Sequence, residues 1–145
     1  PGFPFPSALQ LWGLVLLGGE RLAECVNVGA GPYLGARATC LERAQGRPAA
    51  QPVLDTLSEY AMNPEKADSL FDGSLYASEM AMHAAFHREW DSARLWMRSA
   101  FKESPLGIEP RFLRSGVFND ELIRLGDSLR AEAWKRVEEM VRIKR

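Results

Sequence analysis

Glu79, His83 and His87 follow one another at intervals of four residues, so a helix would carry all three side chains on one face. Two histidines with this spacing can bind one metal ion through their ring nitrogens. The chain has only two histidines, so any further ligand must be a carboxylate or a thiolate. We predict no bound metal and no other cofactor. A small metal-binding protein or enzyme that uses Glu79, His83 and His87 remains the alternative function.

The sequence contains no nucleophile elbow, P-loop or protein-kinase signature. Residues 26–32 read VNVGAGP, in which two glycines follow a short apolar run, as in the nucleotide-binding turn of Rossmann-type methyltransferases. No alternation of strands and helices comes after them, so we interpret these glycines as a turn between helices. We therefore predict no catalytic residues and favour a non-enzymatic role.

Composition places the chain among ordinary globular proteins. It has 145 residues, of which 46% are apolar and 26% charged, with a net charge of −1. Such a chain can bury a core, and its balanced charge argues against a nucleic-acid partner. The apolar run Leu9–Leu17 is shorter than the roughly 20 residues that a membrane-spanning helix needs. We therefore predict a protein or peptide partner, no nucleic acid and no membrane span. Whether the run packs internally or at an interface stays open.

Cys25 and Cys40 are the only cysteines, and neither belongs to a CxxC pair. This usage is typical of buried, reduced thiols in a cytoplasmic protein, which is the localisation that we predict. A bridge between Cys25 and Cys40 remains an open alternative.

Helical periodicity dominates the chain, and regular alternation of apolar and polar residues is absent outside 25–28. The predicted fold class is all-α, built from antiparallel helical hairpins or an irregular bundle. Residues 1–7 are expected to form an extended lead-in, and residues 8–145 one domain. Because the chain begins with Pro1 rather than Met, we interpret it as a fragment of a larger protein. The expected helices cover 8–25, 33–45, 53–61, a short stretch that begins at Pro64 and ends before Gly73, 74–88, 91–104 and 120–143. We expect a turn between Pro48 and Pro52, and Asn119 and Asp120 as the cap of the last helix.

Residues 74–105 have the spacing of a helix–turn–helix unit of about 34 residues. Small residues fall where two helices must approach closely, an aromatic residue fills the corner after the turn, and a proline ends the unit. The residues that carry this pattern are Ala81, Trp90, Asp91, Ala93, Met97, Ala100 and Pro105. This pattern resembles one tetratricopeptide repeat. It departs from the family at Ala77, where a large aromatic residue is usual, and at Arg88, where a glycine is usual. No second clear repeat precedes or follows it.

The resemblance implies that the first helix of the unit lines a concave groove. The residues that would face this groove, and that we predict to bind a partner, are Ser78, Glu79, Met82, Ala85 and Phe86. Met82 and Phe86 lie four residues apart and would form an apolar stripe for a partner helix or an extended peptide. The same two side chains fit equally well as ordinary core residues.

The leading hypothesis is a non-catalytic helical protein–protein interaction module, or scaffold, taken from a larger protein. Besides the metal-binding alternative, a structural domain of a larger enzyme or membrane protein remains open, docked onto other domains of its parent chain.

Overall fold

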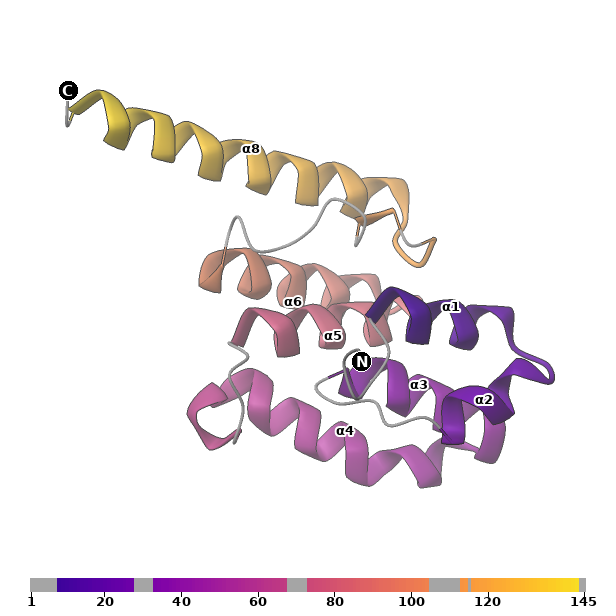
Figure 1. The fold of residues 1–145 in the computed structure, drawn as a ribbon. Coiled ribbons are helices and arrows are strands. Elements are labelled where there is room, and N and C mark those ends of the chain that lie inside the picture. The colour runs from indigo at the N-terminus through magenta and orange to yellow at the C-terminus, as the bar shows by residue number, and fades with distance from the viewer. Residues whose placement is uncertain (1–7, 28–32, 68–72, 105–112, 115, 144–145) are drawn as a thin grey trace, which may run out of the picture.

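The computed structural model describes residues 8–27, 33–67, 73–104, 113–114 and 116–143 (Figure 1). All regular structure in these ranges is helical, so the predicted all-α class is confirmed. The predicted lead-in, residues 1–7, lies outside the described residues. The helices are α1 (Ala8–Leu17), α2 (Arg21–Asn27), α3 (Leu34–Gln45), α4 (Arg47–Met62), the short 3-10 helix η1 (Pro64–Lys66), α5 (Gly73–Phe86), α6 (Trp90–Glu103) and α8 (Asp120–Ile143).

Consecutive helices form two packed hairpins, α3–α4 and α5–α6. Both helices of the first hairpin pack against α5, the first helix of the second hairpin. Helices α1 and α2 lie beside α3, and α8 packs along α6 (Figure 1). Stacked hairpins of this kind are compatible with a helical-repeat arrangement.

The predicted helix over 8–25 is wrong, because the chain breaks at two glycines. Gly18 and Gly19 adopt φ angles of +66° and +56°, which belong to the left-handed region. Side chains other than glycine rarely adopt this conformation, so the helix ends and restarts as α2. A Cβ atom on Gly18 would also lie 2.6 Å from the Arg43 guanidinium. The break therefore lets the apolar α1 turn back onto the body of the molecule.

The predicted turn between Pro48 and Pro52 is also wrong, because α4 begins at Arg47 and runs through both prolines. Pro48 lies in the first turn, where backbone N–H groups have no helical partner and a proline costs little. Pro52 lies inside the helix and removes one backbone hydrogen bond. Burial of Ala50 and Leu57 on the inner face of α4 outweighs that local cost.

The main apolar core joins α1, α5, α6 and the first part of α8. Leu11, Trp12 and Val15 of α1 are buried, whereas Leu16 and Leu17 are exposed, so one face of α1 packs internally. The last helix matches its predicted bounds, and Asn119 caps it by accepting a hydrogen bond from the Leu122 amide at 2.9 Å. None of the described helices is both long and apolar enough to cross a membrane.

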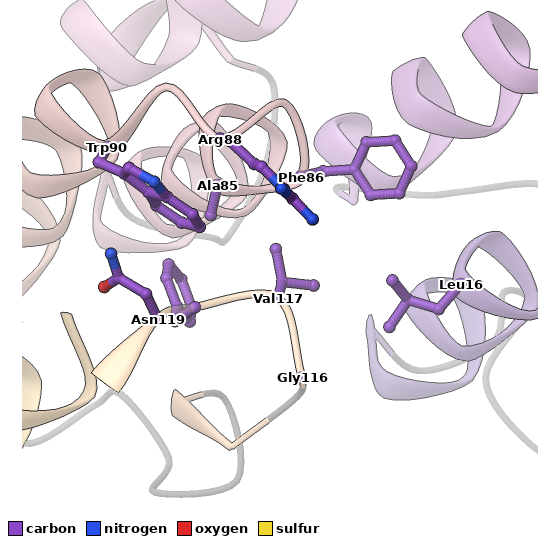
Figure 2. Close-up of a pocket in the computed structure, with 9 residues that line it drawn as sticks. Leu16, Ala85, Phe86, Arg88, Trp90, Gly116, Val117 and Asn119 are labelled. Atoms are coloured by element: carbon purple, nitrogen blue, oxygen red, sulfur yellow. The ribbon is translucent and has the colours of Figure 1, made fainter. Parts of the chain in front are cut away.

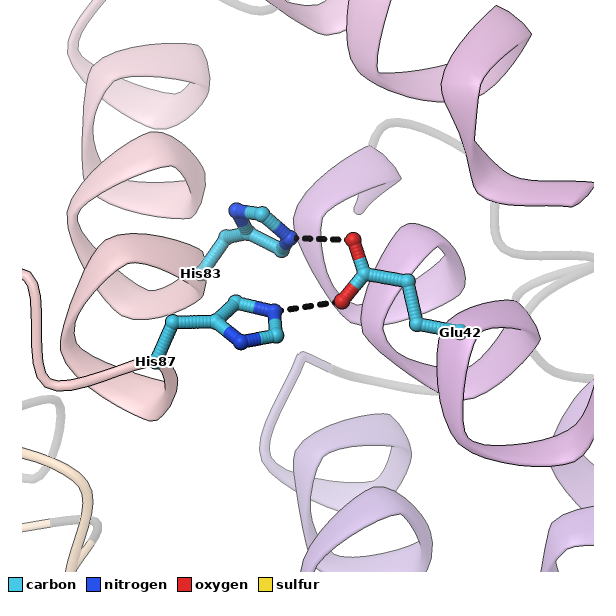
Figure 3. Close-up of side chains that lie close together, drawn as sticks. All are labelled: Glu42, His83 and His87. Atoms are coloured by element: carbon cyan, nitrogen blue, oxygen red, sulfur yellow. Dashed lines mark hydrogen bonds and ion pairs between the residues drawn. The ribbon is translucent and has the colours of Figure 1, made fainter. Parts of the chain in front are cut away.

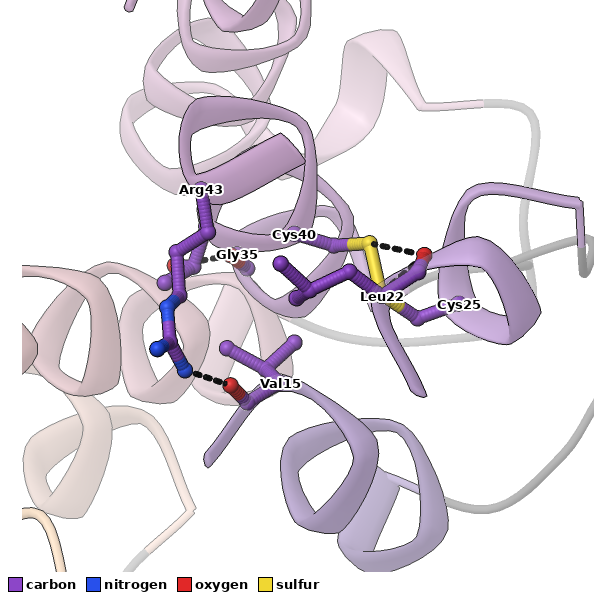
Figure 4. The surroundings of a disulfide bond; sticks show 7 residues. Val15, Leu22, Cys25, Gly35, Cys40 and Arg43 are labelled. Carbon is purple, nitrogen blue, oxygen red and sulfur yellow. Dashed lines mark hydrogen bonds between the residues drawn. A yellow bond between two sulfur atoms is a disulfide. The ribbon is translucent and has the colours of Figure 1, made fainter. Parts of the chain in front are cut away.

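The prediction of two reduced thiols is wrong: Cys25 and Cys40 form a disulfide (Figure 4). Helix α2 packs against α3, which brings the two Cα atoms to 6.3 Å, within the usual range for a bridge. The bridge was the alternative that spacing alone left open. Disulfides form mainly in oxidising compartments, so this bond weighs against the predicted cytoplasmic localisation.

The disulfide closes a short loop, and removing it should destabilise the fold. For a sequence separation of 15 residues, loop-closure entropy predicts that the double variant Cys25→Ser/Cys40→Ser loses about 3 kcal/mol of unfolding free energy. Urea denaturation followed by circular dichroism measures this loss. Wild-type protein kept under a reducing agent is the matched control and should show a similar loss. Equal stability of the oxidised wild type and the double variant would contradict the prediction.

Candidate functional site

Both histidines of the chain point at one carboxylate, that of Glu42 (Figure 3). Nε2 of His83 lies 2.9 Å from Oε1 of Glu42, and Nε2 of His87 makes a short contact with Oε2 of the same residue. The two rings lie edge to face, with centroids 4.7 Å apart. Helix α5 supplies the histidines from successive turns and α3 supplies the carboxylate, so the packing of α3 on α5 builds this triad.

The triad is half enclosed. The side chains of Glu42 and His83 are 5% and 10% exposed, whereas that of His87 is 29% exposed. Burial by itself raises the pKa of the Glu42 carboxyl, but hydrogen bonds and charge interactions with the two histidines together hold this pKa below its usual value. Burial lowers the pKa of His83 and outweighs the opposing effect of Glu42. His83 is therefore biased toward the neutral imidazole, the form that binds metal ions.

Glu79 does not join the two histidines, although it shares their spacing. Its carboxylate accepts hydrogen bonds from Nε1 of Trp12 at 2.9 Å and from the backbone amide of Ala36 at 3.0 Å. Glu79 therefore faces α1 and the first turn of α3, and the acidic member of the triad is Glu42 instead. Sequence reasoning did show that a further ligand must be a carboxylate or thiolate. It could not select Glu42, because Glu42 and His83 are separated by 41 positions in the sequence and meet only through tertiary packing.

Glu79 is buried at the closest approach of two helices. A Cβ atom on Gly35 would lie 2.4 Å from the backbone oxygen of Glu79, so only glycine allows this contact between α3 and α5. Burial raises the pKa of the Glu79 carboxyl to about 7, against the opposing effect of the hydrogen bonds from Trp12, Ala36 and Gly35. A carboxyl group that titrates near neutrality thus lies inside the core.

The other residues of the predicted groove also lie largely inside the molecule. Ser78, Met82 and Ala85 are buried, and α1 contributes Leu11, Trp12 and Val15 to the same core. Phe86 is half-buried and packs against this core. In this structure a partner can therefore reach the predicted groove only at its end, around Ala85 and Phe86.

At that end the surface carries a pocket of about 420 Å³ (Figure 2). The end of α1, the turn between α5 and α6, and the segment before α8 form its walls. Most of the lining residues are of apolar or aromatic types, but polar atoms make up the larger part of the exposed lining, and Arg88 and Asn119 are its polar side chains. The lining residues are Leu16, Ala85, Phe86, Arg88, Trp90, Gly116, Val117, Phe118 and Asn119.

Arg88 has an unusual backbone conformation for its side chain. Its φ angle is +57°, and it is the one described non-glycine residue with positive φ. The left-handed conformation costs a residue with a Cβ atom roughly 1–2 kcal/mol, and glycine avoids this cost. Within the described part of the chain, the Arg88 guanidinium forms no ion pair. A strained residue that directs a cation toward a pocket is typical of a binding site.

Arg43 fixes α1 beside the pocket (Figure 4). Its guanidinium donates a hydrogen bond to the backbone oxygen of Val15 near the end of α1. It also lies over the Phe86 ring, 5.8 Å from the centroid, in a cation–π contact. Arg43 therefore holds two walls of the pocket, Leu16 of α1 and Phe86 of α5, in a fixed relation.

Glu79 should give the protein a measurable pH dependence. Its folded-state pKa is raised from 4.5 to about 7, so the folded protein binds the proton more tightly than the unfolded chain does. The contribution of Glu79 to the unfolding free energy is therefore fully present below pH 4.5 and is lost as pH rises through about 7. A shift of this size corresponds to about 3 kcal/mol.

The variant Glu79→Gln isolates this contribution, because the lowered pKa of His83 acts with opposite sign in an overlapping range. We expect the unfolding free energy of wild type minus that of Glu79→Gln to fall by about 3 kcal/mol between pH 4.5 and 7.5. Chemical denaturation at a series of pH values measures it. A difference that stays constant or rises over this range would refute the prediction.

No protein-family model matches the chain, and no curated protein or solved structure matches it either. The triad, the pocket and the helices that position them are therefore the features from which a function can be inferred.

Proposed function

We propose that this chain is a non-catalytic helical interaction module that binds a peptide segment of a partner protein in the pocket beside the α5–α6 turn. The observation that carries the proposal is Arg88, a left-handed arginine on the wall of a pocket whose other lining residues, apart from Asn119, are of apolar or aromatic types or glycine. A glycine would form this turn at lower cost, so the arginine side chain is best explained by a role at the pocket.

The chemistry of the walls defines the ligand. Phe86, Trp90 and Phe118 offer aromatic surface for a large apolar side chain, and Arg88 offers a cation for a carboxylate. A peptide with an apolar residue next to an acidic side chain or a free C-terminal carboxylate satisfies both. An extended peptide or the end of a helix can present these groups together.

The arrangement of the hairpins supports a repeat-like interpretation. In α5–α6, Ala81 and Ala93 are buried between the helices, and Trp90 begins α6 at the corner after the turn. These are the positions that resemble a tetratricopeptide repeat, and we extend the proposal to that family of binding modules. Here the partner site lies at the end of the expected groove, because α1 packs over its middle.

The pocket predicts a specific loss of binding. From a library of random peptides displayed with free C-termini, wild-type protein should select ligands that carry an apolar residue beside a carboxylate. Synthetic peptides of the selected sequences, titrated against the Trp fluorescence of the protein, should bind the variants Arg88→Gly and Leu16→Arg at least about tenfold more weakly. Tenfold corresponds to about 1.4 kcal/mol, an ordinary contribution for an arginine or an apolar contact at an interface.

Two variants distinguish a loss of peptide binding from a loss of folding stability. Arg88→Gly removes the cation but relieves the left-handed strain, so it should raise the unfolding free energy by about 1 kcal/mol while it weakens binding. Leu95→Arg is the matched control for Leu16→Arg, because Leu95 is also an exposed leucine but lies outside the pocket. Failure to select any peptide, or equal affinity for wild type and Arg88→Gly, would contradict the proposal.

A further inference from the structure

The geometry points to a second site, separate from the pocket: we propose that Glu42, His83 and His87 bind one divalent transition-metal ion, with Zn²⁺ as the expected metal. Glu42, His83 and His87 each offer one ligand atom, and these three atoms lie within 4.8 Å of one another. In the tetrahedral geometry that zinc prefers, bonds of about 2.0–2.2 Å place any two ligand atoms about 3.3–3.6 Å apart. Binding an ion would therefore bring the widest pair closer by up to about 1.5 Å, lengthen the two histidine–glutamate contacts and displace the protons of their hydrogen bonds.

The kind and orientation of the ligands fit this ion. Two imidazole nitrogens and one carboxylate oxygen form a set that zinc and neighbouring first-row metals bind, with further coordination positions left for water. Both histidines direct Nε2 toward the same point, from positions four residues apart on α5 (Figure 3). One histidine would be enough for a structural hydrogen bond to the Glu42 carboxylate. Both histidines of the chain instead converge on this carboxylate, which favours a metal-binding role.

Enclosure and charge favour the same conclusion. Glu42 and His83 are almost covered, which keeps bulk water away from two ligands, whereas His87 remains partly open and gives an ion a route of entry. The Glu89 carboxylate lies close enough to interact electrostatically with His83, so a second negative charge favours a dication. Because the ligands come from α3 and α5, bound metal would join the two hairpins.

Zinc binding should be stoichiometric and should depend on these three side chains. Protein without a histidine tag, dialysed first against a chelator, is titrated with ZnCl₂ by isothermal calorimetry. We expect one ion per chain. At saturation, preferential binding to the folded state should raise the melting temperature by about 5 °C or more. Substitution of Co²⁺ should intensify and shift the weak d–d bands of the aqueous ion, a signature of four- or five-coordinate metal bound to protein ligands.

His87→Ala is the first variant, because His87 is the most exposed ligand and its loss should disturb folding least. It should weaken zinc binding at least 100-fold and abolish the intensified cobalt bands while the far-ultraviolet circular dichroism stays unchanged. Glu42→Gln should have the same effect on the metal. Glu132→Gln, an exposed carboxylate on α8, is the matched control and should bind as wild type does.

Three outcomes would overturn the proposal. The first is wild-type protein that shows no one-to-one binding of Zn²⁺. The second is binding that His87→Ala and Glu42→Gln both leave unchanged. The third is Co²⁺ whose d–d bands in the presence of the protein stay as weak as those of the aqueous ion and do not shift. Each of these results would leave the peptide proposal standing, because the residues that line the pocket are not ligands of the metal.

Discussion

The buried carboxyl group of Glu79 is the contact on which the rest of the structure depends. It lies on α5, and it joins the indole of Trp12 in α1 to the first turn of α3 through the Ala36 amide. Three helices that are remote in sequence thus meet at one side chain. Burying a carboxyl group is costly unless its oxygens accept hydrogen bonds. The amide at the start of α3 and the Trp12 indole meet this requirement, so the position of each helix is fixed by the need to satisfy Glu79.

The packing of α3 against α5 at Glu79 also brings together the three residues of the proposed metal site. Ala36 lies opposite Glu79, and six residues further along α3 Glu42 lies opposite His83 and His87. The contacts advance in the same direction on both helices, so α3 and α5 run parallel, as equivalent helices of successive hairpins do in a repeat. Gly35 lets the helices approach closely at one end, and the triad closes the other. A single packing arrangement thus explains both the buried acid and the triad.

Local sequence signals predicted the features that local forces determine. The bounds of α8 and the Asn119 cap followed from capping chemistry and helical spacing, and the α5–α6 hairpin followed from small residues at the crossing. The errors arose where a distant contact decides the structure. The disulfide, for example, depends on α2 packing against α3. The carboxylate of the triad was missed for the same reason, because periodicity along α5 cannot reveal which acid on α3 lies opposite.

The end of α5 serves both proposed sites, and this placement limits how they can influence each other. Phe86 and Arg88 line the pocket, while His87 between them belongs to the triad, and the rings of Phe86 and His87 lie 5.4 Å apart. A metal ion on His87 would hold the last turn of α5 against α3. Arg43 already holds Phe86 beside α1 from the same side. Ordering of this turn before a peptide arrives would reduce the entropy lost on binding, and by linkage the peptide would tighten metal binding by the same factor. The left-handed Arg88 lies at the point where that turn ends, directly after the ligand His87. The cation proposed to bind the peptide and the histidine proposed to bind the metal therefore belong to one structural unit.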